Sequence, residues 1–263
     1  MTDDTEPLQA VLDAPDDDAP RLAYAAWCDG QGEVVSSARA ELIRDQITLA
    51  GMDPADLKAG RGFRLERRIE QGLERHHAAW AQPLLGWVRA AHFQRGFVGW
   101  IHLSARQWLD HGAQILAHAP VQHLDLVGIR DVDEALFESP SWAGIRSLSM
   151  NDCGLHDVHL QMLAASPHVT ELRWLSVADN HLGQTASEAL AKSSTLHRLG
   201  FVELGSNPFD PVEQEGVDGG VVVASSMPPE GKDLEARFGY QRWLHRGRGA
   251  GRFAVDQATT QSP

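Results

Sequence analysis

The side chains best suited to chemistry in this 263-residue chain are its thirteen histidines and two cysteines. The segment His156-Asp157-Val158-His159 places two imidazoles close together, and His168 and His181 follow. Imidazole is a common zinc ligand and a common general base. Cys28 and Cys153 are the two thiols, and either would become a nucleophile if the fold placed a histidine beside it.

The surroundings of these residues favour structural roles. The chain contains no H-E-x-x-H, C-x-x-C, G-x-S-x-G or phosphate-binding glycine motif. Both cysteines lie in apolar stretches, where burial raises a thiol pKa and makes the thiol inert. His156 and His159 are expected at the start of a helix on the outer side of the fold, where exposed polar residues are usual. The sequence therefore predicts no catalytic residue, no metal ligand and no cofactor.

Two further polar motifs have a structural interpretation. The run Asp16-Asp17-Asp18 lacks the alternating ligands, central glycine and terminal glutamate of an EF-hand loop. We expect it to start a helix, with Asp18 or Ala19 as the N-cap and Pro20 as the first helical residue. His76 and His77 are adjacent on one expected helix, so their rings point in different directions and do not chelate one metal.

The N-terminal third has the apolar spacing of four helices. The first helix holds Leu8, Val11 and Leu12 and stops at Pro15, and the second holds Leu22 to Cys28. A third helix is expected over about residues 37–50. A fourth is expected over about residues 64–88, kinked or divided at Pro83.

From residue 97 onward the chain repeats the template L-x-x-L-x-L-x-x-N/C-x-L, the pattern of leucine-rich repeats. Copies begin at positions 98, 121, 145, 172 and 199, so the spacing of successive units is nearly regular. The segments between them repeat too, since Leu163-Ala164-Ala165-Ser166 recurs one unit later as Leu190-Ala191-Lys192-Ser193. Each unit reads as a strand, a turn and a helix.

Stacking explains why these residue types recur. One strand and one helix do not bury their apolar face alone, and adjacent units together build a continuous core. Asn180 and Asn207 stand where the chain leaves the strand, so their amides can bond the backbone of neighbouring turns. Cys153 takes the same position in the preceding unit as a small buried substitute. After Phe209 the repeat ends.

The C-terminal segment differs in composition from the repeats. Residues 210–220 are acidic and glycine-rich and are expected to form a loop. Val221-Val222-Val223 is expected to be a short strand covering the last unit, and a brief helix closed by Gly239 follows. Residues 237–252 hold five arginines and no acid. This basic tail is expected to dock on the chain's own acidic surface or to contact an anionic partner, and residues 256–263 are expected to be disordered.

The strands of such an array should present alternate residues on one solvent-facing, concave side. The first outward column is Trp100, His123, Ser147, Trp174 and Phe201, and a second follows it. Aromatic side chains on an exposed surface are typical of binding hot spots. The alternative is that the C-terminal segment or the N-terminal helices cover this face. The candidate partner-binding residues are Trp100, His102, His123, Asp125, Trp174, Ser176, Phe201 and Glu203.

Composition restricts the class of protein. The formal charge is −13 with histidine neutral, which argues against a general nucleic-acid binder, although less so at the basic tail. No apolar run approaches the roughly 18 residues of a transmembrane span, and the first residues do not resemble a signal peptide. The two cysteines, far apart in the chain, read as reduced thiols. We therefore expect a cytoplasmic protein without membrane association.

The N-terminal run resembles a known bacterial family. Leu8 to Trp27, with its Pro15-Asp16-Asp17-Asp18-Ala19-Pro20-Arg21-Leu22 core, is similar to the repeat-companion domain of myxobacteria and planctomycetes, which precedes leucine-rich repeats. Residues 39–46 resemble its second half, and Arg95-Gly96-Phe97-Val98 resembles its usual junction with the first repeat. The segment 32–37 departs from the compact turn of the family. The resemblance implies no general activity, and leucine-rich repeats commonly bind proteins.

These observations predict an α/β chain. Residues 1–92 form a helical companion domain, residues 93–212 an array of about five strand-turn-helix units similar to ribonuclease inhibitor, and residues 213–263 a C-terminal cap and basic tail. The expected function is a non-catalytic adaptor that binds a protein or peptide, such as an enzyme encoded nearby. The alternatives are a subunit that contributes a His/Cys metal or thiol site to an enzyme complex, and a structural subunit of a homo-oligomer.

Overall fold

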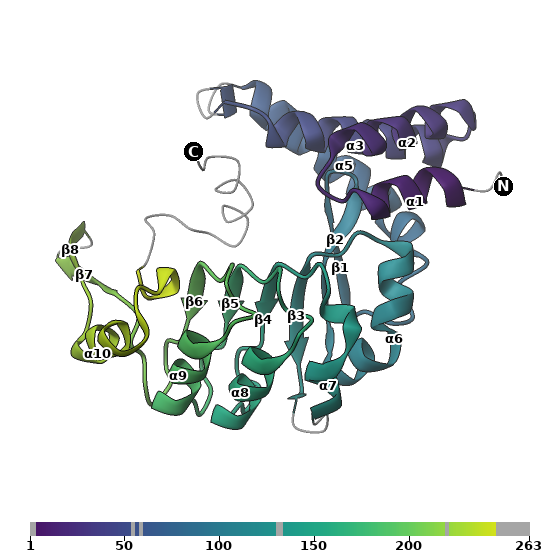
Figure 1. Cartoon of the computed structure of the whole chain (residues 1–263). Coiled ribbons are helices and arrows are strands. Elements are labelled where there is room, and N and C mark those ends of the chain that lie inside the picture. The colour runs from purple at the N-terminus through teal and green to yellow at the C-terminus, as the bar shows by residue number, and fades with distance from the viewer. Residues whose placement is uncertain (1–3, 54–55, 58–59, 130–133, 219–220, 246–263) are drawn as a thin grey trace. The chain divides into compact units, whose positions relative to one another are not determined.

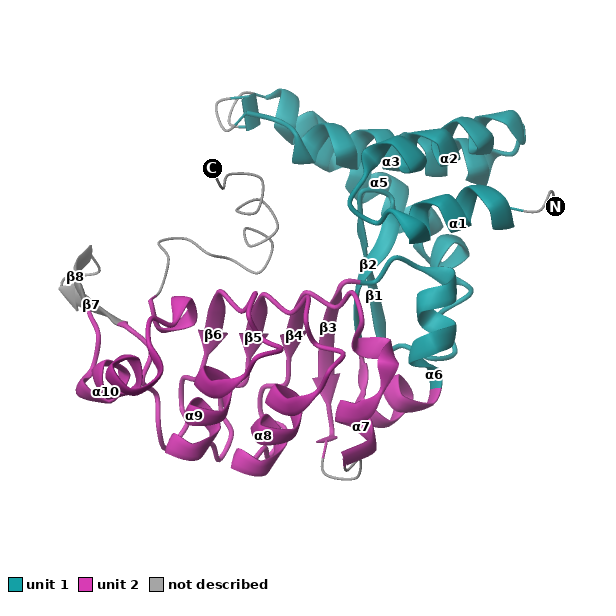
Figure 2. Cartoon of the chain, in the orientation of Figure 1, with its two compact units in different colours: residues 1–102, 111–121 teal, residues 103–110, 122–263 magenta. Residues whose placement is uncertain are grey.

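The computed structural model describes residues 4–53, 56–57, 60–129, 134–218 and 221–245 (Figure 1). The described part is mixed α/β, with nine α-helices and a mostly parallel six-stranded sheet in the order β1-β2-β3-β4-β5-β6. Two compact units divide the chain. Unit 1 comprises residues 1–102 and 111–121, and unit 2 comprises residues 103–110 and 122–263 (Figure 2).

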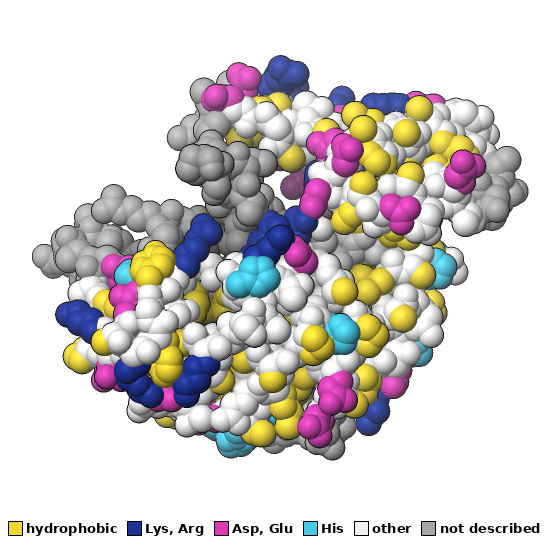
Figure 3. All heavy atoms as spheres, viewed as in Figure 1, with side chains coloured by type: hydrophobic (Ala, Val, Ile, Leu, Met, Phe, Trp, Pro, Cys, Tyr) yellow, Lys and Arg dark blue, Asp and Glu magenta, His cyan; other side chains and the backbone are white. Residues whose placement is uncertain are grey.

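Charged side chains are interspersed with apolar ones on the visible surface of both units (Figure 3). None of the described helices combines the length and the apolar composition that crossing a bilayer requires.

Unit 1 contains the four helices that the apolar spacing predicts. Helix α5 ends just before Pro83, as expected from the ring's clash with a continuing helix. The core of the unit joins Val11, Tyr24, Cys28 and Ile43 to Phe97 of a β-hairpin. The elements of unit 1 are α1 (Thr5–Asp13), α2 (Asp18–Gly30), α3 (Val34–Ala50), α5 (Arg61–Ala81) and β1 (Ala90–Gln94), with β2 (Phe97–Ser104) and α6 (Ala105–His118) divided between the two units.

The N-cap of α2 is Asp17, one position earlier than the sequence predicts. Its carboxylate accepts a hydrogen bond from the backbone N–H of Ala19 at 2.9 Å, so Pro20 is the third helical residue and not the first. The expected Asp18 and Ala19 lie inside the first turn. Their neighbour Asp17 is extended, and that conformation lets its side chain reach back over the helix start.

The turn of the β1–β2 hairpin is held against the helices of unit 1. Arg95 and Gly96 have φ of +45° and +84°, as a two-residue hairpin turn requires. The Gly96 N–H donates to Gln46 Oε1 at 2.7 Å. A Cβ at Gly96 would overlap the Ile43 side chain and stand 2.7 Å from Ile43 Cα. Only glycine therefore satisfies both the backbone and the space at this position.

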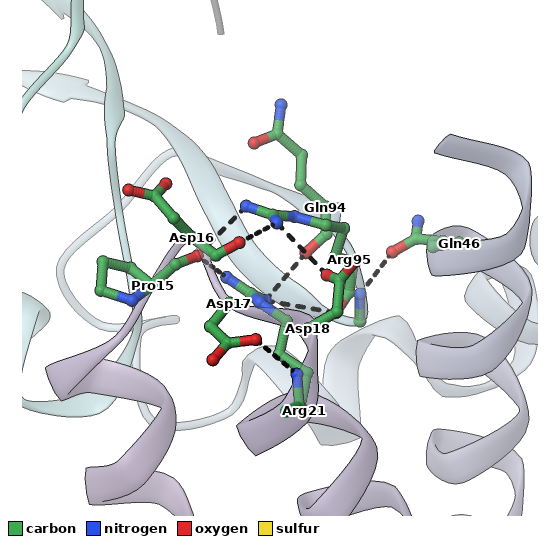
Figure 4. A network of polar contacts seen from close by, with 10 residues as sticks. Pro15, Asp16, Asp17, Asp18, Arg21, Gln46, Gln94 and Arg95 are labelled. Atoms are coloured by element: carbon green, nitrogen blue, oxygen red, sulfur yellow. Dashed lines mark hydrogen bonds and ion pairs between the residues drawn. The ribbon is translucent and has the colours of Figure 1, made fainter. Parts of the chain in front are cut away.

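Two arginines join the same turn to the loop between α1 and α2 (Figure 4). Arg21 donates to the Pro15 carbonyl at 2.8 Å and to the Arg95 carbonyl at 3.2 Å. Arg95 donates to the Asp16 carbonyl at 2.8 Å and to the Asp18 carboxylate at 3.2 Å. The aspartate run is thus a structural hydrogen-bonding segment as well as a helix start, because it supplies acceptors to a guanidinium group of the hairpin turn.

A buried cation lies between the hairpin and the helices of unit 1. The Arg39 guanidinium carbon is 4.8 Å from the Phe93 ring centroid, 5.1 Å from that of Phe97 and 5.4 Å from that of Trp80. Burial lowers the pKa of Arg39 to about 10. The three rings offer the electrostatic attraction that compensates in part for the lost hydration of the cation.

The substitution Gly96→Ala tests how the hairpin turn is fitted into unit 1. We expect a loss of about 3 kcal/mol or more in unfolding free energy, because left-handed strain adds to the overlap with Ile43. Gly32→Ala is the matched control, since Gly32 has φ of +69° and nothing within 4 Å of its Cβ position. The control should cost about 1 kcal/mol. Equal losses in urea denaturation would contradict the close fit.

Unit 2 is a series of short strands followed by helices, and α8 and α9 lie on one side of the strands (Figure 1). The buried side chains of this core include Leu124, Leu148, Leu175 and Val202, which occupy equivalent positions on four successive strands. The elements are β3 (His123–Val127), α7 (Glu134–Glu138), a 3₁₀ turn (Pro140–Trp142), β4 (Ser147–Ser149), α8 (Asp157–Ala165), β5 (Trp174–Ser176), α9 (Gln184–Lys192), β6 (Phe201–Glu203), β7 (Gln214–Asp218), β8 (Val221–Ser226), α10 (Pro229–Phe238) and a 3₁₀ turn (Arg242–Leu244).

The side chain of Asn180 joins neighbouring turns, as the repeat pattern predicts. Its Oδ1 accepts from the N–H groups of Cys153 and Leu155 at 3.0 and 2.9 Å. Its Nδ2 donates to the carbonyls of Met150 and Val177, both at 2.9 Å. One buried amide therefore satisfies backbone groups of two successive units.

The equivalent positions before and after Asn180 act in the same way. Asn207 Oδ1 accepts from the Leu182 N–H at 3.1 Å, and its Nδ2 donates to the Val177 carbonyl at 2.9 Å. The Cys153 thiol donates to the Leu126 carbonyl, with 3.3 Å between sulfur and oxygen. The small thiol reaches one unit back but has fewer bonding groups than an amide.

The C-terminal part differs from the sequence expectation in one element. The expected loop over residues 210–220 contains a strand, β7, which pairs antiparallel with β8 in a separate two-stranded sheet. Asp218 pairs with Val221, so the strands flank Gly219-Gly220, a dipeptide typical of hairpins. Pairing outweighed the low strand propensity of acidic and glycine residues. A strand at Val221 and the helix closed by Gly239 are confirmed, but β8 pairs with β7 in the separate sheet and does not extend the six-stranded sheet beyond β6.

The substitution Asn180→Ala tests whether this amide stabilises the turns of neighbouring units. The change leaves the buried N–H groups of Cys153 and Leu155 without this acceptor, so we expect a loss of about 3 kcal/mol or more in unfolding free energy. Asn151→Ala is the matched control. Asn151 is exposed, and its side chain accepts hydrogen bonds from Ser176 and Ala178, so the change should cost about 1 kcal/mol. A smaller loss of unfolding free energy for Asn180→Ala than for Asn151→Ala would contradict this role of Asn180.

Candidate functional site

Parallel pairing aligns the predicted binding residues of unit 2 in two rows. Neighbouring strands pair residue for residue, so each position of β3 continues across β4, β5 and β6. We call these positions the strand face. Its first row is His123, Ser147, Trp174 and Phe201, and its second row is Asp125, Ser149, Ser176 and Glu203.

The strongest feature of the strand face is an aromatic pair. The rings of Trp174 and Phe201 stack with their centroids 5.6 Å apart and their planes within 3°. Paired strands lie about 4.8 Å apart, so in-register aromatic side chains fall naturally at stacking distance. Both side chains are half-buried, and each keeps part of its surface exposed.

Three residues predicted to face solvent are buried instead. The exposed fractions are 1 % for His123, 1 % for Ser147 and 3 % for Ser176. Ser147 is a small side chain in the row between His123 and Trp174, and Ser176 donates to Asn151 Oδ1 at 2.8 Å. Strand alternation fixes the direction of a side chain but not its exposure. Asp125 and Glu203 remain half-buried.

Two predicted residues belong to unit 1. Trp100 and His102 lie on β2, and the Trp100 ring stacks on His92 of β1 with 4.0 Å between centroids. His102 offers its backbone carbonyl to the N–H of Arg89 at 2.8 Å. The structure therefore groups six of the eight predicted residues on unit 2 and places these two in the other unit.

Arginine recurs at the residue just before two strands of unit 2. Arg146 and Arg173 immediately precede β4 and β5, and their carbonyls accept hydrogen bonds from the following strand at 2.8 to 3.1 Å. The third equivalent position is Gly200, where the Arg242 side chain lies 3.4 Å from the Cβ site. Arg242 thus comes from the C-terminal turn to the place that an arginine occupies in the two preceding units. Sequence periodicity could not show this replacement.

The C-terminal cap is bound to unit 2 by apolar and charged contacts. Trp243 and Leu244 are buried, and the Leu244 carbonyl accepts from the Glu213 N–H at 2.8 Å. Arg237 pairs with Glu188 of α9 at 2.8 Å, and this hydrogen bond lowers the pKa of Glu188. Basic and acidic side chains accordingly lie side by side over α9 and α10 (Figure 3). Arg246, Arg248 and Arg252 of the predicted basic tail lie outside the described residues.

A second candidate site is a cavity of about 250 Å³ whose lining includes Cys153, His156, His159 and His181. The His156 ring centroid is 5.1 Å from that of His181 and 6.2 Å from that of His159. His159 Nδ1 accepts from the His156 N–H at 2.9 Å, so one imidazole nitrogen is used in capping α8. Within the described ranges, no three His, Cys, Asp or Glu side chains are placed to hold a metal ion.

Burial disfavours the thiolate form of both cysteines. Burial raises the pKa of Cys28 to about 11 and also raises the pKa of Cys153. In this state neither thiol resembles an activated nucleophile, which needs a lowered pKa. The sequence interpretation of Cys153 as a structural thiol agrees with its hydrogen bond to Leu126.

Comparison with protein-family models, curated proteins and solved structures found no match to this chain.

Thiol titration tests the state of the two cysteines. With Ellman's reagent near neutral pH, we expect no rapid reaction of the folded chain and reaction of both thiols after denaturation. Because folding raises both thiol pKa values, their contribution to stability is present below about pH 8.5, the pKa of an unfolded thiol, and is lost as the pH rises toward the folded values. Fast stoichiometric labelling of either cysteine in the folded chain would contradict this result and would favour the alternative in which the chain contributes a thiol site to an enzyme complex.

Proposed function

We propose that this chain is a non-catalytic adaptor that binds a protein or peptide through the strand face of unit 2. The single observation that carries the proposal is the stacked pair of Trp174 and Phe201 on adjacent strands. Rigid aromatic side chains supply large contact area at little cost in conformational entropy, which makes them typical anchors of interfaces. The partner would be scaffolded or regulated by this contact, and an enzyme encoded nearby fits that role.

The proposed architecture is a repeat-companion domain followed by leucine-rich repeats. Two observations support it. The strand register of β4, β5 and β6 coincides with the alignment of the sequence repeat. The amides of Asn180 and Asn207 bond neighbouring turns at the template position. A cytoplasmic location accords with two buried, unpaired cysteines.

The double variant Trp174→Ala, Phe201→Ala tests the proposed function. We expect it to lose the partner that the unaltered chain captures from its native host, with binding weakened about tenfold or more, because both anchors are removed. The matched control is Val158→Ala, Tyr240→Ala. This pair removes side chains that are 46 % and 72 % exposed and are not among the residues of the strand face.

Folding must be followed in parallel, since Trp174 and Phe201 are half-buried. Circular dichroism should show a retained fold in both double variants. Retention of the captured partner by the folded Trp174→Ala, Phe201→Ala chain would show that the strand face is not the binding surface.

A further inference from the structure

The charged residues of helix α5 in unit 1 are sorted onto two flanks of the helix. Four arginines follow one another at spacings of three, four and seven residues, which places them within about 60° of one another around the helix axis. Three glutamates at spacings of four take the other flank. The buried Leu65 and Ile69 lie between the two flanks. We call the first flank the arginine edge, formed by Arg61, Arg64, Arg68 and Arg75, and the acids of the second flank are Glu66, Glu70 and Glu74.

The arginine edge is exposed and only partly neutralised. All four of its residues are exposed, and Arg68 pairs with Asp45 of α3. Among the described residues, no carboxylate lies within ion-pair distance of the other three guanidinium groups, those of Arg61, Arg64 and Arg75. On a chain with a formal charge of −13, this edge is therefore a local excess of positive charge.

The ion pair of Arg68 orients one guanidinium group at the surface. Arg68 Nε and Nη2 donate to the two carboxylate oxygens of Asp45, so the pair is bidentate. The Asp45 side chain is 10 % exposed, whereas that of Arg68 is 59 % exposed. A buried carboxylate thus holds an exposed guanidinium, whose remaining N–H groups can donate to a second carboxylate.

The same edge borders a cavity between α3 and α5. Its volume is about 110 Å³, which is a few water volumes and admits a side-chain carboxylate. The lining includes Arg68, Arg75 and the exposed Glu41. Because Glu41 is negatively charged and lies beside these arginines, it opposes the approach of a further carboxylate. Removal of its charge should therefore favour an acidic ligand.

We propose that the arginine edge binds an acidic segment of a partner protein, as a second contact surface in addition to the strand face. Carboxylates complement arginines in charge and in the planar geometry of bidentate pairing. Fourteen positions separate Arg61 from Arg75, so the edge is about 21 Å long. About six residues of extended chain cover that length. A short run of aspartate or glutamate therefore fits the whole edge.

A nucleic acid fits the arginine edge less well than an acidic peptide. Its closely spaced phosphates would lie against Glu41, and the chain is acidic as a whole. An acidic peptide can place its carboxylates at the arginines and an uncharged residue at Glu41. The experiment below includes a nucleic acid so that the two ligands are compared directly.

Fluorescein-labelled hexa-glutamate tests this proposal on the full-length chain. It is titrated by fluorescence anisotropy at physiological ionic strength, which limits long-range repulsion by the net charge of −13. Hexa-glutamine and a six-nucleotide oligothymidine, labelled in the same way, are the comparison ligands. We expect hexa-glutamate to bind more tightly than either. The double variant Arg64→Gln, Arg75→Gln should weaken this binding by about tenfold, and Glu41→Gln should strengthen it by about threefold.

Two matched variants separate the arginine edge from the overall charge of the chain. Glu74→Gln removes one exposed acid from the opposite flank of α5, and Lys232→Gln removes one exposed base from α10 in unit 2. Each should change hexa-glutamate binding by less than about twofold. All of these substitutions are at exposed residues, so circular dichroism should show a retained fold in every variant.

Absence of hexa-glutamate binding would overturn the proposal, as would equal binding by the unaltered chain and the Arg64→Gln, Arg75→Gln variant. Tighter binding of oligothymidine than of hexa-glutamate would assign the edge to nucleic acid and would also overturn it. The strand-face proposal is tested separately, because none of these variants alters Trp174 or Phe201.

Discussion

Unit 2 depends on the requirement that buried backbone groups at each turn find partners. Asn180 meets this requirement by bonding the N–H groups of Cys153 and Leu155 and the carbonyls of Met150 and Val177. Because this amide bonds the backbone of two successive turns, a shift of one unit along its neighbour would break these hydrogen bonds, so the alignment of adjacent units is fixed. The residue-for-residue pairing of β4, β5 and β6 follows, and with it the position of every side chain on the strand face.

The aromatic pair is a direct consequence of that fixed offset. Trp174 and Phe201 stack because they occupy the same position in two adjacent units. A slip of one residue would turn both rings to the other side of the sheet. The same offset places Glu203 on the side of Phe201 and groups the second row beside the first. The repeat itself therefore positions the candidate binding side chains on this surface, and no separately folded loop is needed to place them.

Periodicity in the sequence is sufficient to predict the strands β3 to β6, their alignment and the role of Asn180, since each depends on residue type at a fixed spacing. It is insufficient for exposure, because alternation along a strand gives the side to which Ser147 and Ser176 point and not what packs over that side. It also missed Arg242 at Gly200 and the fit of Gly96 against Ile43, which join segments far apart in the chain. Strand β7 is not predicted, because its acidic and glycine residues have low strand propensity and its pairing with β8 stabilises it only in the folded chain.

The central claim is that the strand face of unit 2 receives the partner. Hydrogen–deuterium exchange of the full-length chain, with and without its captured partner, measures this contact most directly. The account predicts new protection confined to segments 146–151, 173–178 and 200–205, which carry the strands and the residues beside them. Protection centred on α8 and α9, with these three segments unchanged, would contradict it.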